Sequence, residues 1–131
     1  MITDITMSPA GGPVALRVAS DKFPQSVAGV VWRYNADKSK DGKAGLFSTD
    51  VPSFTLGVPS SILGKYFLVE GAVLHQNDDP PTPYMISISV TQDQVVLFAG
   101  PPPSGGSGTV GTADVPFRFT FRLVGGGGNP P

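Results

Sequence analysis

The sequence predicts an all-β fold, a two-layer antiparallel β-sandwich of jelly-roll or immunoglobulin-like type with about eight short strands. Three observations predict it. Apolar residues recur at every second position, as they do in strands that bury one face. Glycine and proline number 17 and 14, enough to end most segments with a turn. Glu70 is the sole glutamate, whereas the solvent face of a surface helix is usually rich in glutamate.

The length of 131 residues matches one domain with one hydrophobic core. We expect this domain to cover residues 1–124. A flexible tail rich in glycine and proline is expected over residues 125–131. The segment Pro101–Gly108, which has a similar composition, is expected to be a flexible loop.

The strand with the clearest pattern is Val115–Leu123. Val115, Phe117, Phe119, Phe121 and Leu123 occupy alternate positions, so their side chains are expected to enter the core. The intervening residues then face the other way.

Two hairpins are predicted. Tyr84–Val90 and Val95–Phe98 are separated by a short polar turn over residues 91–94. Ala28–Tyr34 and Gly45–Thr49 flank a polar run in which Asp41-Gly42 favours a tight turn. The remaining expected strands are Val14–Val18, Ser53–Leu56 and Lys65–His75. In the last of these, Gly71 is expected to mark a bulge or bend.

Charge and composition exclude several classes of partner. The formal net charge of −1 gives no reason to expect nucleic acid or an anionic membrane surface, and no apolar run is long enough to span a bilayer. The chain has no cysteine, so disulfides and thiolate chemistry are absent. Its first residues lack the pattern of a signal peptide. We therefore expect a cytoplasmic location, with export by another route left open.

Three oxygen-bearing residues before a glycine, Asp37, Ser39 and Asp41, have the spacing that begins an EF-hand calcium loop. Ser48 stands where the bidentate glutamate of such a loop would be, and the flanking segments are expected to be strands. A solvated hairpin tip is therefore the favoured interpretation, and a calcium site the alternative.

Aromatic residues next to an arginine, Trp32, Arg33 and Tyr34, could bind a sugar or a peptide. Alternation places Trp32 and Tyr34 on one face of the strand and Arg33 on the other. Because Arg33 is expected to point outward, we favour Trp32 as a core residue.

Other polar groups are weaker candidates. His75 lies near Asp78 in an acidic loop that could bind a metal, although a polar turn is the favoured interpretation. Tyr84 is a further candidate for ligand binding. Glu70, within an apolar strand, could be an acid catalyst; we favour an ion pair with Arg33, Arg118 or Arg122.

No set of residues has the spacing of a catalytic site, so we expect no enzyme activity and no cofactor. The leading hypothesis is a non-catalytic binding or assembly module that contacts a protein partner or forms a homo-oligomer. The alternative is a lectin-like, carbohydrate-binding domain, with calcium as a possible aid. A small hydrolase that uses Glu70 or Asp78 with His75 ranks last.

Overall fold

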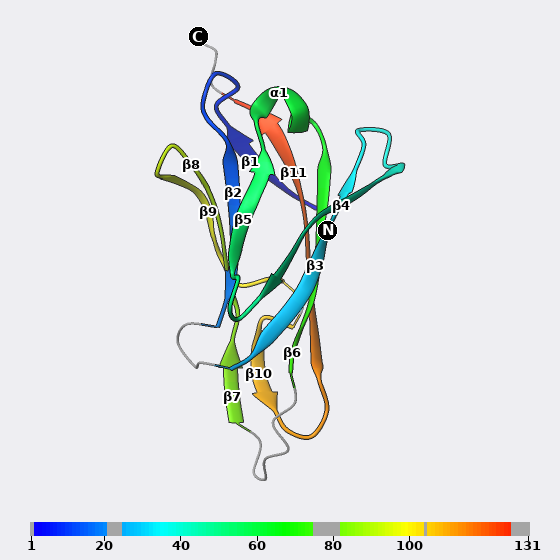
Figure 1. Ribbon diagram of the computed structural model, residues 1–131, viewed down its shortest axis with the longest axis vertical. Helices are drawn as coiled ribbons and strands as arrows, with labels where there is room; N and C mark the ends of the chain where they lie inside the picture. Colours follow the sequence, from blue (N-terminus) through cyan, green and yellow to red (C-terminus); the bar gives the residue numbers. More distant parts are fainter. Residues whose placement is uncertain (1, 21–24, 75–81, 104, 127–131) are drawn as a thin grey trace.

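The computed structural model describes residues 2–20, 25–74, 82–103 and 105–126. Strands contain 64% of these residues. One short helix, α1 (Pro59–Ile62), is present in the described part of the chain (Figure 1). The predicted β class is therefore confirmed, with several antiparallel sheets. Across the described ranges, no helix has the length and apolar character needed to cross a membrane.

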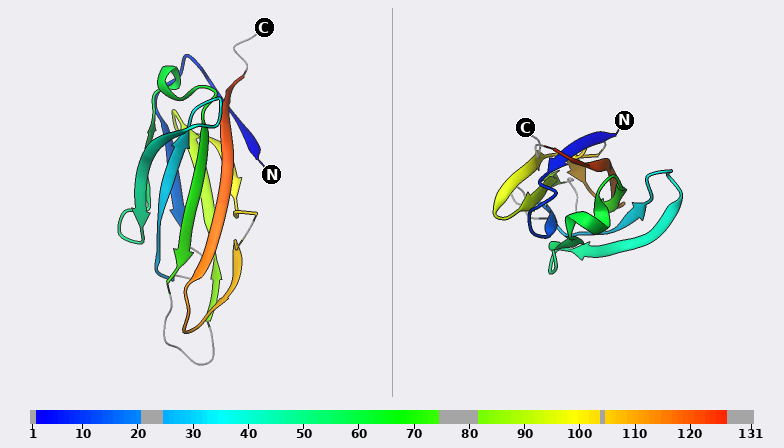
Figure 2. Two further views of the ribbon diagram at one scale, coloured as in Figure 1. Left: turned by 90° about the vertical axis from the view of Figure 1, so that its right-hand side faces the viewer. Right: turned by 90° about the horizontal axis from the view of Figure 1, so that it is seen from above.

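The largest sheet has five strands in the order β1-β11-β6-β3-β4. Its strands are antiparallel except for β1, which runs parallel to β11. Their bounds, in this order, are Thr3–Met7, Val115–Gly125, Tyr66–Val73, Val27–Tyr34 and Lys40–Ser48. The left view of Figure 2 looks onto this sheet.

A four-stranded sheet in the order β5-β2-β8-β9 lies behind the first in that view (Figure 2). Its strands are Ser53–Gly57, Val14–Ala19, Ser87–Gln92 and Val95–Gly100. A small third sheet pairs β10 (Ser107–Val110) with β7 (Thr82–Met85). Side chains from all three sheets form one hydrophobic cluster.

The alternation predicted for β11 is confirmed. Phe117, Phe119, Phe121 and Leu123 are at most 2% exposed, whereas Arg118 lies on the other side of the strand and is exposed. The rings of Phe119 and Phe121 stack at 5.4 Å between centroids. Burying side chains of this size contributes roughly 1.5 to 3 kcal/mol each, and β11 supplies four of the largest fully buried side chains.

Both predicted hairpins exist. Between β8 and β9, Asp93 and Gln94 have φ angles of 51° and 65°, the pair of positive values that a two-residue type I′ turn needs. Between β3 and β4, the chain turns at residues 35–39, with Lys38 at φ 70°. The prediction of a turn at Asp41-Gly42 was wrong because both residues belong to β4.

Gly71 marks a close approach of side chains. The register of β6 is regular on both sides of this residue, so the predicted bulge was wrong. A Cβ atom on Gly71 would lie 2.5 Å from the Phe117 ring and 2.7 Å from the Phe47 ring. Gly29, its partner on β3, is equally crowded, and the two glycines make room for the two rings.

Two strands, β1 and β10, lie outside the predicted set. The single strand predicted over Tyr84–Val90 was wrong, because the structure divides this segment between β7 and β8, which belong to different sheets. The segment expected to be a loop up to Gly108 overlaps β10, which begins at Ser107. At the other end of the chain, β11 continues to Gly125, and the Gly126 amide donates to the Met7 carbonyl. The described part of the expected tail is therefore bound to the sheet, and residues 127–131 lie outside the described ranges.

Candidate functional site

The side of the five-stranded sheet that faces away from the core carries aromatic side chains, and we call it the outer face. Register brings residues of β3, β6 and β11 together there in rows across the sheet. One row is Tyr34, Tyr66 and Arg122; the next is Trp32, Leu68 and Thr120. The outer face therefore joins segments that are far apart in the sequence.

Trp32 belongs to the outer face. Its neighbour Val31 is fully buried, whereas Trp32 is half-buried and its indole Nε1 donates a hydrogen bond to Glu70 Oε1 at 3.0 Å. The interpretation of Trp32 as a core residue was therefore wrong. Alternation correctly grouped Trp32 with Tyr34, but the smaller Val31 on the opposite side faces the core.

A hollow of about 220 Å³ lies on the outer face beside Tyr66. Its lining is almost entirely apolar, with one lysine at its margin; the lining residues are Ile2, Tyr34, Lys38, Tyr66, Leu68 and Thr120. Pockets for drug-sized ligands usually measure about 300 to 1,000 Å³. This hollow is smaller, and its size suits a single ring of a ligand.

Cationic side chains lie over the aromatic rings of this face. The Lys40 ammonium is 4.1 Å from the Trp32 ring centroid. Lys38 and Arg122 both lie 5.6 Å from the centroid of Tyr66. Such contacts are attractive because the face of an aromatic ring carries negative charge. The outer face thus combines apolar ring surface with donors for hydrogen bonds.

Two polar contacts fix the orientation of these rings. Arg122 donates to the Tyr66 hydroxyl at 3.3 Å and forms an ion pair of 2.9 Å with Asp4 on β1. Asp4 thereby holds the guanidinium in place, and its hydrogen bond with Arg122 lowers the pKa of the Asp4 carboxyl. Fixed aromatic side chains lose little conformational entropy when a ligand binds.

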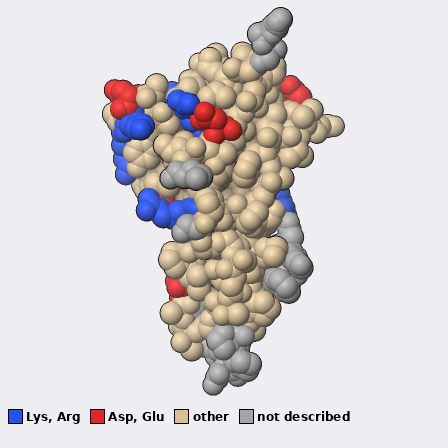
Figure 3. Space-filling view, turned by 180° about the vertical axis from the view of Figure 1, so that it is seen from behind, with Lys and Arg blue, Asp and Glu red and all other residues tan. Residues whose placement is uncertain are grey.

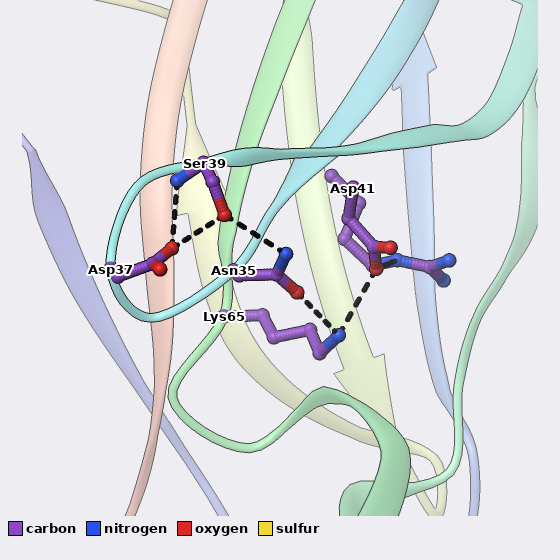
Figure 4. Close-up of polar contacts among 6 residues, drawn as sticks. Asn35, Asp37, Ser39, Asp41 and Lys65 are labelled. Carbon is purple, nitrogen blue, oxygen red and sulfur yellow. Dashed lines mark hydrogen bonds and ion pairs between the residues drawn. The ribbon is translucent and has the colours of Figure 1, made fainter.

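Arg33 lies apart from Trp32 and Tyr34. Its Nε donates to Asp41 Oδ2 at 2.7 Å, and Lys65 Nζ donates to the same oxygen at 3.0 Å (Figure 4). The two hydrogen bonds, that from Lys65 first, lower the pKa of the Asp41 carboxyl. The structure therefore brings two members of the predicted aromatic platform together and assigns Arg33 to a salt-bridge network.

The residues considered for calcium binding have partners within the protein. Asp37 Oδ1 accepts hydrogen bonds from the Ser39 amide at 2.9 Å and the Ser39 hydroxyl at 2.6 Å, while Asp41 is neutralised by Arg33 and Lys65 (Figure 4). No group of three or more metal-binding side chains occurs in the described ranges. These contacts favour a structural hairpin tip over a cation site.

Tyr84, another predicted ligand-binding residue, is 3% exposed in the core. Its hydroxyl donates to the Gly105 carbonyl at 3.0 Å, which ties the segment before β10 to β7. Burial raises the pKa of Tyr84. This position suits a structural role. His75 and Asp78 lie outside the described residues.

Glu70 forms the expected ion pair, since its Oε2 lies 3.5 Å from Arg118 Nη2. The other carboxylate oxygen accepts the Trp32 indole hydrogen. Both oxygens of Glu70 therefore contribute to the order of the outer face.

Sequence reasoning missed Tyr66, Lys38 and Lys40. The one signal in the sequence is the alternation along residues 65–75, which puts Tyr66 and Leu68 on the same face of the strand as Glu70. The positions of the lysines depend on the turn between β3 and β4. Most basic side chains visible in Figure 3 gather along one edge of the molecule, on the side of this hairpin.

Comparison of the chain with protein-family models, curated proteins and solved structures finds no match.

Proposed function

We propose that the sheets form a two-layer antiparallel β-sandwich of the Greek-key kind that includes jelly-roll and immunoglobulin-like folds. Two observations support this architecture. The core cluster combines buried side chains from the five-stranded and four-stranded sheets. Neighbouring strands such as β6 and β11, or β2 and β8, are far apart in the sequence, as long Greek-key connections require.

We propose that the protein is a non-catalytic, lectin-like binding module that binds a saccharide on its outer face. The observation that carries this proposal is the grouping of Trp32, Tyr34 and Tyr66 on the solvent side of a rigid sheet, next to a hollow of ring size. The apolar side of a sugar ring packs on aromatic rings, while its hydroxyls bind to polar groups at the margin.

The environment of Glu70 supports binding over catalysis. An acid catalyst needs a carboxyl that is free to exchange a proton with a substrate, and a glycosidase needs a second carboxyl about 5 to 10 Å away. Glu70 is held by Trp32 and Arg118.

A glycan array probed with the full chain tests the proposal. We expect binding to a limited set of saccharides, and loss of at least about tenfold in affinity for Trp32→Ala and Tyr66→Leu, because each removes a stacking surface. Tyr84→Phe is the matched control, since it changes an aromatic residue in the core and should leave binding unchanged. The absence of any bound glycan, with or without calcium, would refute the proposal.

Self-association is a second candidate, favoured by a separate apolar surface beside the edge strand β4. Leu46 and Val51 are 60% and 55% exposed and line a shallow depression of about 460 Å³. An edge strand with apolar neighbours can pair with a second copy of the chain. Sedimentation equilibrium should then show a dimer that Leu46→Lys converts to monomer; a monomer at all concentrations would exclude this candidate.

A further inference from the structure

Lys38 and Lys40, on the β3–β4 hairpin, lie at or near the hollow. Lys38 lines the hollow, and Lys40 follows it on the same hairpin. Within the described ranges, neither lysine forms an ion pair. Each ammonium instead lies over an aromatic ring, Lys38 over Tyr66 and Lys40 over Trp32. Lys38 at the hollow and Lys40 opposite Tyr34 therefore carry positive charges that no ion pair neutralises within the described ranges, although the whole chain has a net charge of −1.

The acidic groups nearest to this hairpin are all engaged elsewhere. Asp37 binds Ser39, and Asp41 binds Arg33 and Lys65. Asp4 is paired with Arg122. The hydrogen bonds that these three carboxyls accept lower their pKa values, which shows that each is stabilised in its ionised, bound form. Asp4 and Asp41 are already paired with cations, and Asp37 forms no ion pair with Lys38.

Resting on the proposed function, we infer that the saccharide is acidic, with a sugar ring that carries a carboxylate, as in uronic or sialic acids. The ring would occupy the hollow against Tyr66 and Leu68, and the carboxylate would accept a hydrogen bond from the Lys38 ammonium. A charge-assisted hydrogen bond of this kind is about twice as strong as a neutral one. A neutral sugar would leave Lys38 without an ion-pair partner.

The backbone of Lys38 makes the inference testable. Its φ of 70° lies in the left-handed region, where residues other than glycine and asparagine are uncommon. A glycine at this position would relieve the backbone and remove the cation in one step. If Lys38 serves only the turn, Lys38→Gly should be harmless; if it serves the ligand, binding should fall while stability is kept.

The experiment is calorimetric titration of the full chain with an oligogalacturonate, a sialyllactose and the methyl ester of each. Methyl esters keep the sugar ring and remove the charge. We expect at least one acid to bind about tenfold more tightly than its ester, and Lys38→Gly to lose that advantage without a lower melting temperature. Lys38→Arg should retain it. Lys43→Ala, which removes the same charge from β4 outside the hollow, should also retain it.

Three outcomes would overturn the inference. Equal binding of acid and ester, with both lost in Trp32→Ala, would refute the acidic ligand and leave the proposed function intact. Equal losses in Lys43→Ala and Lys38→Gly would show that net charge, and not the hollow, selects the acid. Absence of binding by every saccharide would refute the proposed function and, with it, this inference.

Discussion

The two faces of the five-stranded sheet use aromatic side chains in different ways. On the inner face, the rings of Phe117, Phe119 and Phe121 are buried and fill the core. On the outer face, Trp32 and Tyr66 are half-buried, and ammonium or guanidinium groups lie over their rings. If the proposed function is correct, the inner face of these strands supplies stability and the outer face supplies binding.

The largest effect is expected from truncation of the inner face. Phe119 stacks on Phe98 at 5.0 Å and on Phe121 at 5.4 Å. Phe119→Ala should lower the free energy of unfolding by about 3 to 5 kcal/mol, because it leaves a cavity among these rings. Thr120→Ala, the next residue on the opposite face, should change it by about 0.5 kcal/mol or less. Urea denaturation measures both; similar losses would contradict the division between faces.

A smaller loss of stability is expected when a methyl group is added where the core has no space for it. At Gly29, a Cβ atom would lie 2.4 Å from the Glu70 carbonyl oxygen and 2.4 Å from the Phe47 ring. Gly29→Ala should therefore cost about 1 to 3 kcal/mol through overpacking. Gly100→Ala is the matched control, since its nearest neighbour would be at 3.7 Å. If the two alanine substitutions change the free energy of unfolding equally, β3 and β6 do not approach each other as closely as described.

The smallest effect concerns the salt bridges at the end of the sheet. Hydrogen bonds from Lys65 and Arg33 lower the pKa of Asp41 below its ordinary value of 3.8. A carboxyl with a lowered pKa stabilises the fold above its unfolded pKa, and this contribution is lost as pH falls through the folded pKa. Between about pH 5 and about pH 2, the melting temperature should therefore fall more steeply in the natural chain than in Asp41→Asn. Parallel curves would show that these ion pairs contribute nothing measurable.

The inner face could be predicted from the sequence because β11 alternates large apolar residues with polar ones. The same rule failed for β3, where Val30, Trp32 and Tyr34 alternate with Val31 and Arg33. Both sets contain apolar residues, so local periodicity defines the two faces of β3 without deciding which one is buried. Pairing with β6 decides it, because Val31 lies opposite the buried Val69.

The candidate site was predictable only in part. Trp32 and Tyr34 were recognised from their own chemistry. Tyr66 joins them through a strand pairing between residues that are more than 30 positions apart, and local patterns do not encode such pairings. The position of Lys38 depends on where the β3–β4 turn lies, and Lys38 is itself the left-handed residue of that turn. The sequence instead favours a turn at Asp41-Gly42, a typical turn dipeptide that lies within β4.

The fluorescence of Trp32 tests the account most directly, because this residue is the single tryptophan of the chain. If the outer face is the binding surface, acrylamide should quench the native emission readily, and titration with an acidic oligosaccharide should change the emission and reduce quenching. Emission that is already inaccessible to acrylamide in the native protein, and that does not respond to any saccharide, would contradict the placement of Trp32 and the function proposed for its face.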